Sequence, residues 1–145
     1  MSLTNVEDLD LDLEPVPVGE LALQTLAMPK DTNANGDIFG GWLVSQMDLA
    51  AAIATKQVTR GRSATVAIKN VAFLAPVSVG SIVSCYAEIV EIGRSSMHIN
   101  IEVWNSNSLT HAGLRKVAEG LFVFVAIDEN GRTRRIEVPR SNETP

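Results

Sequence analysis

Cysteine and histidine are scarce in this chain of 145 residues, which contains one cysteine, Cys85, and two histidines, His98 and His111. A lone cysteine forms no disulfide within the chain, so a scaffold held together by disulfides is excluded and a reducing compartment such as the cytoplasm is expected. No spacing of His, Cys, Asp and Glu is typical of a metal site. We therefore expect no bound metal.

Long hydrophobic runs are also missing. No segment approaches the roughly 18 apolar residues that a membrane span needs, and no basic N-terminal stretch precedes an apolar block. We expect neither a transmembrane helix nor a signal peptide. Basic residues are outnumbered, with a net charge of −5, which argues against a nucleic-acid-binding protein. Arg132, Arg134, Arg135 and Arg140 cluster near the C-terminus, where we expect a solvated charged segment.

With 46% hydrophobic and 20% charged residues, the chain has the composition and the length of one folded domain. Residues 1–19 alternate acids with leucines, contain no Lys or Arg, and end in a proline-rich stretch. We expect this segment to be a flexible acidic tail. The domain itself is expected over residues 20–140, followed by a short tail at 141–145.

The pattern of apolar residues predicts one long helix and several strands. Residues 41–57 are rich in alanine and, after the first position, contain neither glycine nor proline, so they predict a helix of about 25 Å. Strand-like segments with period-two alternation surround it. They cover residues 21–28, 64–74, 82–92, 96–104 and 117–127.

Connections between the last four strands are too short for parallel crossovers, so the sequence predicts an α+β protein in which an antiparallel sheet wraps around one central helix. This is the hotdog arrangement. The helix is apolar over most of its circumference, whereas one sheet covers only one side. We therefore expect a second subunit to cover the rest, in a homodimer.

Gly40 and Gly41 stand at the start of the predicted helix. The first N–H groups of a helix have no partner within it, and the helix dipole places about half a positive charge there. Such amides suit a carbonyl oxygen that becomes negative during nucleophilic attack. The glycines could equally serve only the bend between loop and helix, and the pattern leaves both interpretations open.

Asp48 lies within this apolar helix, about 10 Å along the axis from Gly41. Aspartate is a modest helix former that prefers caps, so the position calls for a reason. One reason is catalysis, since an ionised carboxylate attacks directly or activates a water molecule. The other is a small solvated face, because Ser45, Thr55 and Lys56 share the same arc of the helix.

Two other segments carry polar groups that suit a site. Asn33, Asn35 and Asp37 lie in the loop before the helix, where they form either a turn or part of a site. The turn Gly93-Arg94-Ser95-Ser96 offers a guanidinium, hydroxyls and amides that suit phosphate oxygens, although such a motif alone is usually a hairpin turn. We expect Cys85 in the core and both histidines at the surface.

Residues 28–48, MPKDTNANGDIFGGWLVSQMD, resemble the acyl-CoA thioesterase branch of the hotdog superfamily, which includes the YciA-type bacterial enzymes and brain acyl-CoA hydrolase. The resemblance continues over residues 64–104 and 122–140 and so extends over most of the chain. It implies hydrolysis of acyl-CoA to the free acid and coenzyme A without a cofactor, by a homodimer or a trimer of dimers. Neither nucleic acid nor membrane is implied as a partner.

The resemblance also implies roles for individual residues. Asp48 would be catalytic and would act across the dimer on a thioester held at the partner's helix N-terminus, by Gly40 and Gly41. Asp37 would belong to the active-site loop, with Asn35 as a further candidate. The coenzyme A part of the substrate would contact Arg94, Ser95 and Ser96 with its nucleotide, and Thr65 and Val66 with its pantetheine arm.

Two other functions fit the sequence less well than hydrolysis of acyl-CoA. A hotdog hydratase or dehydratase would use a histidine with a carboxylate, and neither His98 nor His111 fits that role. A non-catalytic acyl-CoA sensor would be expected to lose the acid at position 48 and to gain a DNA-binding segment, and the sequence shows neither change. Lys69 departs from the family's usual acidic residue, so the preferred acyl chain length stays open.

Overall fold

The structure, a computed structural model, describes residues 15–107 and 113–137. Its elements are β1 (Glu20–Leu26), a short 3-10 helix η1 (Pro29–Asp31), α2 (Gly40–Val58), β2 (Arg62–Phe73), β3 (Ile82–Ile92), β4 (Ser96–Ser106) and β5 (Arg115–Ile127). The long helix and all five predicted strands are confirmed, with small shifts at their ends. Most of the expected acidic tail, His111, Arg140 and residues 141–145 lie outside the described residues.

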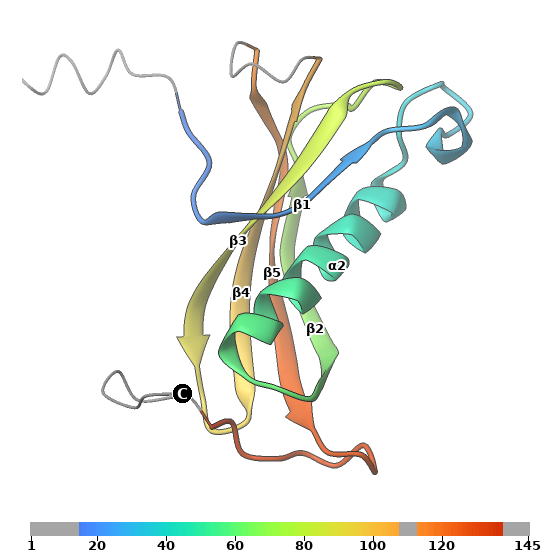
Figure 1. Ribbon diagram of the computed structural model, residues 1–145. Coiled ribbons are helices and arrows are strands. Elements are labelled where there is room, and N and C mark those ends of the chain that lie inside the picture. Colours follow the sequence, from blue (N-terminus) through green and yellow to red (C-terminus); the bar gives the residue numbers. More distant parts are fainter. Residues whose placement is uncertain (1–14, 108–112, 138–145) are drawn as a thin grey trace, which may run out of the picture.

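The five strands form one antiparallel sheet in the order β1-β3-β4-β5-β2. The helix lies across one face of this sheet (Figure 1). The two strands that flank α2 in the sequence, β1 and β2, form opposite edges, so α2 is the connection that carries the chain across the whole width. The predicted antiparallel sheet around one central helix is therefore confirmed.

The core lies between α2 and the sheet. Leu43 and Met47 are buried on the helix, and Phe122 is fully buried on β5. Small residues let the two layers approach closely: a Cβ atom on Gly120 would lie 3.3 Å from the Met47 Cε atom. Cys85 is fully buried in the same core, as predicted.

A second apolar surface is left uncovered along α2 and the edge strand β2. On the helix, Leu49 is 53% exposed and Ile53 is 43% exposed. On β2, the exposed fractions are 59% for Val66 and 44% for Ile68. Large apolar side chains at this exposure on two neighbouring elements are typical of a protein interface. The surface lies where the sequence predicts that a second subunit covers the helix.

The outer face of the sheet, away from α2, holds a buried carboxylate at Glu102. Its Oε1 atom accepts hydrogen bonds from Trp104 Nε1 at 3.0 Å and from the Val18 backbone N–H at 3.1 Å, and Lys116 Nζ lies 3.2 Å from Oε2. Burial alone would raise the pKa of the Glu102 carboxyl, but these hydrogen bonds and the Lys116 charge hold that pKa below its usual value. Glu102 thereby ties the segment before β1 to the sheet.

Replacing Glu102 with glutamine keeps the size of the side chain but removes its charge. We expect Glu102→Gln to lower the free energy of unfolding by about 1–3 kcal/mol at neutral pH, the usual cost of leaving buried donors poorly paired. A lowered carboxyl pKa stabilises the fold above the ordinary titration range, and this contribution disappears as the pH falls through the lowered value. The difference from wild type should therefore shrink in acid.

Urea unfolding at neutral pH and near pH 3 measures both effects. Glu88→Gln is the matched control, because Glu88 lies on the neighbouring strand β3 with an exposed side chain. Equal stability of Glu102→Gln and wild type at neutral pH would contradict the assigned role of Glu102.

Candidate active site

Asp48 and Thr65, which are 17 positions apart in the sequence, meet between the helix and the edge strand. The Thr65 hydroxyl donates a hydrogen bond of 2.7 Å to Asp48 Oδ1. The Asp48 side chain is half-buried, and among the described residues Thr65 is its only hydrogen-bond donor. One carboxylate oxygen is thus fixed by the protein, and Oδ2 remains available to a water molecule or a substrate.

Thr65 lies on the helix-facing side of β2, directly before a β-bulge. Thr65 pairs with Phe124, and Ala67 pairs with the adjacent Val123, so Val66 is the extra residue of the bulge. Phe124 is buried, and Thr65, directly opposite it, shares its face of the sheet, which α2 covers. Asp48 and Thr65 belong to different elements, and nothing in the period-two pattern of residues 64–74 indicates which helix residue a strand side chain meets. The side-chain contact with Asp48 was therefore not predicted.

The helix begins at Gly40, one residue earlier than predicted. The N–H groups of Trp42 and Leu43 donate to the Phe39 carbonyl at 3.1 and 3.4 Å, so the amides of Gly40 and Gly41 precede the first intrahelical bonds. A Cβ atom on Gly40 would lie 3.0 Å from the Phe73 ring. Gly40 therefore leaves space for Phe73 of β2 and also exposes backbone amides.

The loop before the helix is organised by Asn33. Its Oδ1 atom accepts hydrogen bonds from the backbone N–H groups of Asn35 at 2.9 Å and Asp37 at 3.2 Å, and its own N–H donates to the Asp37 carbonyl at 2.7 Å. Asn33 therefore stabilises the turn. The side chains of Asn35 and Asp37 are exposed, and neither has a hydrogen-bond partner in the described part of the chain. Both are free to face a ligand.

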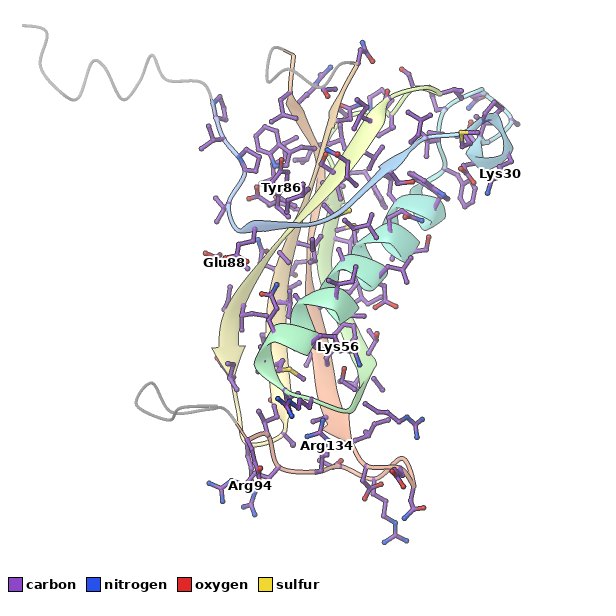
Figure 2. All side chains as sticks on the ribbon, viewed as in Figure 1. Lys30, Lys56, Tyr86, Glu88, Arg94 and Arg134 are labelled. Atoms are coloured by element: carbon purple, nitrogen blue, oxygen red, sulfur yellow. The ribbon has the colours of Figure 1, made fainter. Side chains whose placement is uncertain are left out.

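The Arg94 turn lies at the other end of the molecule. Gly93 N–H donates to the Ser96 carbonyl at 2.8 Å and closes the hairpin between β3 and β4. Figure 2 shows Arg94 at the end of the sheet where α2 terminates, with its side chain pointing outward. The structure therefore separates the predicted nucleotide contacts from Gly40 and Gly41 by the length of the helix.

The remaining reactive side chains lie outside this site. Burial raises the pKa of the Cys85 thiol to about 12, so almost no thiolate forms at neutral pH. His98 is half-buried on β4, with Nδ1 3.8 Å from Glu91 Oε2, so it is less exposed than predicted. Within residues 15–107 and 113–137, no cluster of three or more His, Cys, Asp or Glu side chains could hold a metal ion. The helices in this range include none suited to crossing a membrane.

Comparisons with known proteins agree on one family. Residues 35–112 match the Thioesterase superfamily. The acyl-CoA thioester hydrolase YciA of Escherichia coli K12 is 52% identical over 125 residues, which cover 85% of this chain and 95% of that protein. These similarities extend over nearly the whole domain.

Solved structures of thioesterases show a similar fold and a similar level of sequence identity to this chain. HI0827, a hexameric broad-specificity acyl-coenzyme A thioesterase, aligns with a TM-score of 0.78 and 48% identity, covering 88% of this chain and 86% of that one. The hexameric thioesterase y2039 of Yersinia pestis aligns with a TM-score of 0.79 and 50% identity, covering 84% of this chain and 99% of that one. The predicted hotdog fold is confirmed.

The buried thiol leads to a simple prediction. The native protein should react with a thiol reagent such as DTNB far more slowly than free cysteine, because Cys85 is both inaccessible and protonated. In denaturant, one thiol per chain should react. A rapid reaction of the native protein would show that Cys85 is exposed and would make it a candidate nucleophile.

Proposed function

The chain belongs to the Thioesterase superfamily, and from this premise we propose that it hydrolyses acyl-CoA thioesters to the free carboxylic acid and coenzyme A. The observation that carries the proposal is the Asp48 carboxylate, held by Thr65 beside an uncovered apolar surface. A sensor would need no such fixed carboxylate. The lone buried cysteine is compatible with a cytoplasmic enzyme.

Asp48 supplies the reactive group of the proposed mechanism. Its free oxygen either removes a proton from a water molecule as that water attacks the thioester carbonyl, or attacks the carbonyl itself to form an anhydride that water then hydrolyses. Thr65 fixes the orientation of the carboxylate in both routes. The carbon–sulfur bond breaks when the tetrahedral adduct of the first route collapses, or as the anhydride of the second route forms. The coenzyme A thiolate leaves readily in both cases because a thiol has a low pKa compared with an alcohol.

The helix N-terminus supplies the second part of the mechanism. The amides of Gly40 and Gly41 donate hydrogen bonds to the carbonyl oxygen as it becomes negative. Asp48 lies eight residues from Gly40, or about 12 Å along the helix axis. A reacting group must lie within about 3–3.5 Å of both partners, so Asp48 and the amides of one chain cannot act on the same thioester.

We therefore propose that each site is shared by two subunits. Asp48 from one subunit acts on a thioester whose carbonyl is bound by the helix N-terminus of the partner. The uncovered apolar surface with Leu49, Ile53, Val66 and Ile68 suits the dimer interface. Because the similar thioesterases are hexameric, we propose that three such dimers assemble into a hexamer.

The loop and strand residues complete the proposed site. Asp37 and Asn35 present exposed side chains near the helix N-terminus, where they would contact the acyl or pantetheine part of the substrate. The backbone at Val66, at the bulge of β2, would lie along the pantetheine arm. Arg94, Ser95 and Ser96 would contact the nucleotide.

Substitution of Asp48 tests the mechanism directly. We expect Asp48→Asn to lower kcat by about 10²–10⁴-fold, because the amide neither attacks nor accepts a proton from water. The measurement is thiol release from a series of acyl-CoA substrates of increasing length, with thermal unfolding on the same samples as a control for folding. Turnover near the wild-type level would contradict the mechanism.

The shared site makes activity depend on association. Sedimentation at micromolar concentration should show a dimer or a multiple of it, and Ile53→Glu should shift the protein to smaller species and lower kcat, since the new charge would be buried at the interface. Val90→Glu adds the same charge at an exposed apolar position on β3, three strands away from β2 in the sheet, and is the matched control. A monomeric Ile53→Glu variant with full turnover would contradict the shared site.

A further inference from the structure

The outer face of the sheet lacks the helical cover that the inner face has (Figure 1). At the end of the sheet near Trp104, the segment before β1 lies against this outer face, through the hydrogen bond from Val18 N–H to Glu102. Over the rest of the outer face, no helix or strand of the described residues packs on it, since α2 is the one long helix in this range and lies on the opposite side. An isolated subunit would therefore expose that part to water.

Strand β5 is apolar toward both faces of the sheet. Its residues 121–127, LFVFVAI, are apolar without interruption. The aromatic residues of this run, Phe122 and Phe124, are buried in the core with α2. The residues that alternate with them point outward: Leu121, Val123 and Val125. In an antiparallel sheet with one face in water, outward positions are usually polar, and a continuous apolar run is typical of a strand covered on both faces. The pattern therefore indicates a second layer on the outer face.

The strand register extends this apolar area onto β2. Val125 pairs with Ala64 and Val123 pairs with Ala67, and paired residues share a face of the sheet. We call the area formed by these four residues and Leu121 the outer patch. Its side chains on β2 are small, so a second layer can approach closely. Because β2 also carries part of the uncovered apolar surface beside α2, the outer patch adjoins the surface proposed for the dimer.

A polar atom beside the outer patch lacks a hydrogen-bond partner. His98 of β4 lies directly opposite Val123, and its Nδ1 atom is buried but makes no hydrogen bond within the described residues. Glu91 Oε2 lies 3.8 Å away, which is too far for a hydrogen bond. Buried polar atoms are nearly always paired, so an unpaired one calls for an explanation. A protein surface packed on the outer patch would offer His98 a partner.

The two sides of the outer patch carry opposite charges. One row of paired residues across the sheet consists of Glu88 on β3, Asn100 on β4, Leu121 on β5 and Lys69 on β2. Glu88 and Lys69 are both exposed, and neither has an ion-pair partner in the described part of the chain. A twofold axis along the strands would place Lys69 of each patch over Glu88 of the other. The outer patch is therefore complementary to itself, as a contact between identical surfaces requires.

We propose that the outer patch binds the outer patch of a second dimer, and that these contacts join three dimers into the hexamer. The inference rests on the proposed function, in which the uncovered surface of α2 and β2 makes the dimer and a further surface must join the dimers. Each dimer has two outer patches, so contacts of this kind can close a ring of three dimers. Burial of apolar residues from both layers stabilises the contact, as between the two sheets of a β-sandwich.

Three charged variants test the proposal. Leu121→Glu and Ala67→Glu each place a charge in the outer patch, on two different strands. Val79→Glu is the matched control, because Val79 is exposed in the connection that precedes Ile82, the first residue of β3. Sedimentation measures the mass of each variant, and thermal unfolding checks that it is folded. We expect both outer-patch variants to be folded dimers with about one third of the wild-type mass, and Val79→Glu to remain a hexamer.

A cysteine variant tests the same contact without adding a charge. Leu121→Cys introduces the one reactive thiol of the native protein, because burial raises the pKa of the Cys85 thiol to about 12. We expect DTNB to react about 10-fold or more slowly with Leu121→Cys than with the double variant that also carries Ala67→Glu, since the contact covers position 121 only in the former. Sedimentation of the same samples shows which assembly each reaction rate describes.

Several results would overturn the proposal. Hexamers in both Leu121→Glu and Ala67→Glu would do so, as would equal DTNB rates in the two cysteine samples. A wild-type protein no larger than a dimer would leave the outer patch to a partner of another kind, and a folded monomer in Leu121→Glu would show that the outer patch makes the dimer itself. Failure of the proposed function looks different, because the wild-type hexamer would then form but would hydrolyse no acyl-CoA.

Discussion

The helix α2 has more apolar surface than one sheet can cover, and the rest of the architecture depends on this excess. Its inner side, with Leu43 and Met47, packs against the sheet and forms the core. Its outer side leaves Leu49 and Ile53 half-exposed beside the equally uncovered strand β2. Burial of apolar area is the main driving force for association, so the same helix that organises the subunit also favours association with a second subunit.

Asp48 lies at the boundary between these two sides. Toward the subunit interior its carboxylate accepts the Thr65 hydrogen bond, and toward the uncovered surface it is open to a ligand. The catalytic role proposed for Asp48 requires both properties, because the carboxylate must be held in one orientation and must still reach a substrate. Thr65, on the helix-facing side of β2, meets the first requirement.

The two ends of α2 have different electrostatic properties. The N-terminus, at Gly40 and Gly41, exposes amides and the positive end of the helix dipole, which suits an oxygen that gains negative charge. At the C-terminus, Lys56 and Arg134 donate to backbone carbonyls of the following loop. Basic side chains there also complement the negative end of the dipole. Both ends of α2 thus present positive charge, from backbone amides at one end and from side chains at the other.

By itself the sequence determined the helix, the strands and their antiparallel arrangement, because these follow from local periodicity and from the length of the connections. It also singled out Asp48, as an acid in an apolar helix, and Cys85 as a core residue. Only the tertiary structure decided that Thr65 holds Asp48 and that the Arg134 side chain joins the loop after α2 to the end of β5. These contacts are hydrogen bonds between elements that are far apart in the chain. Local sequence patterns carry no information about such pairings.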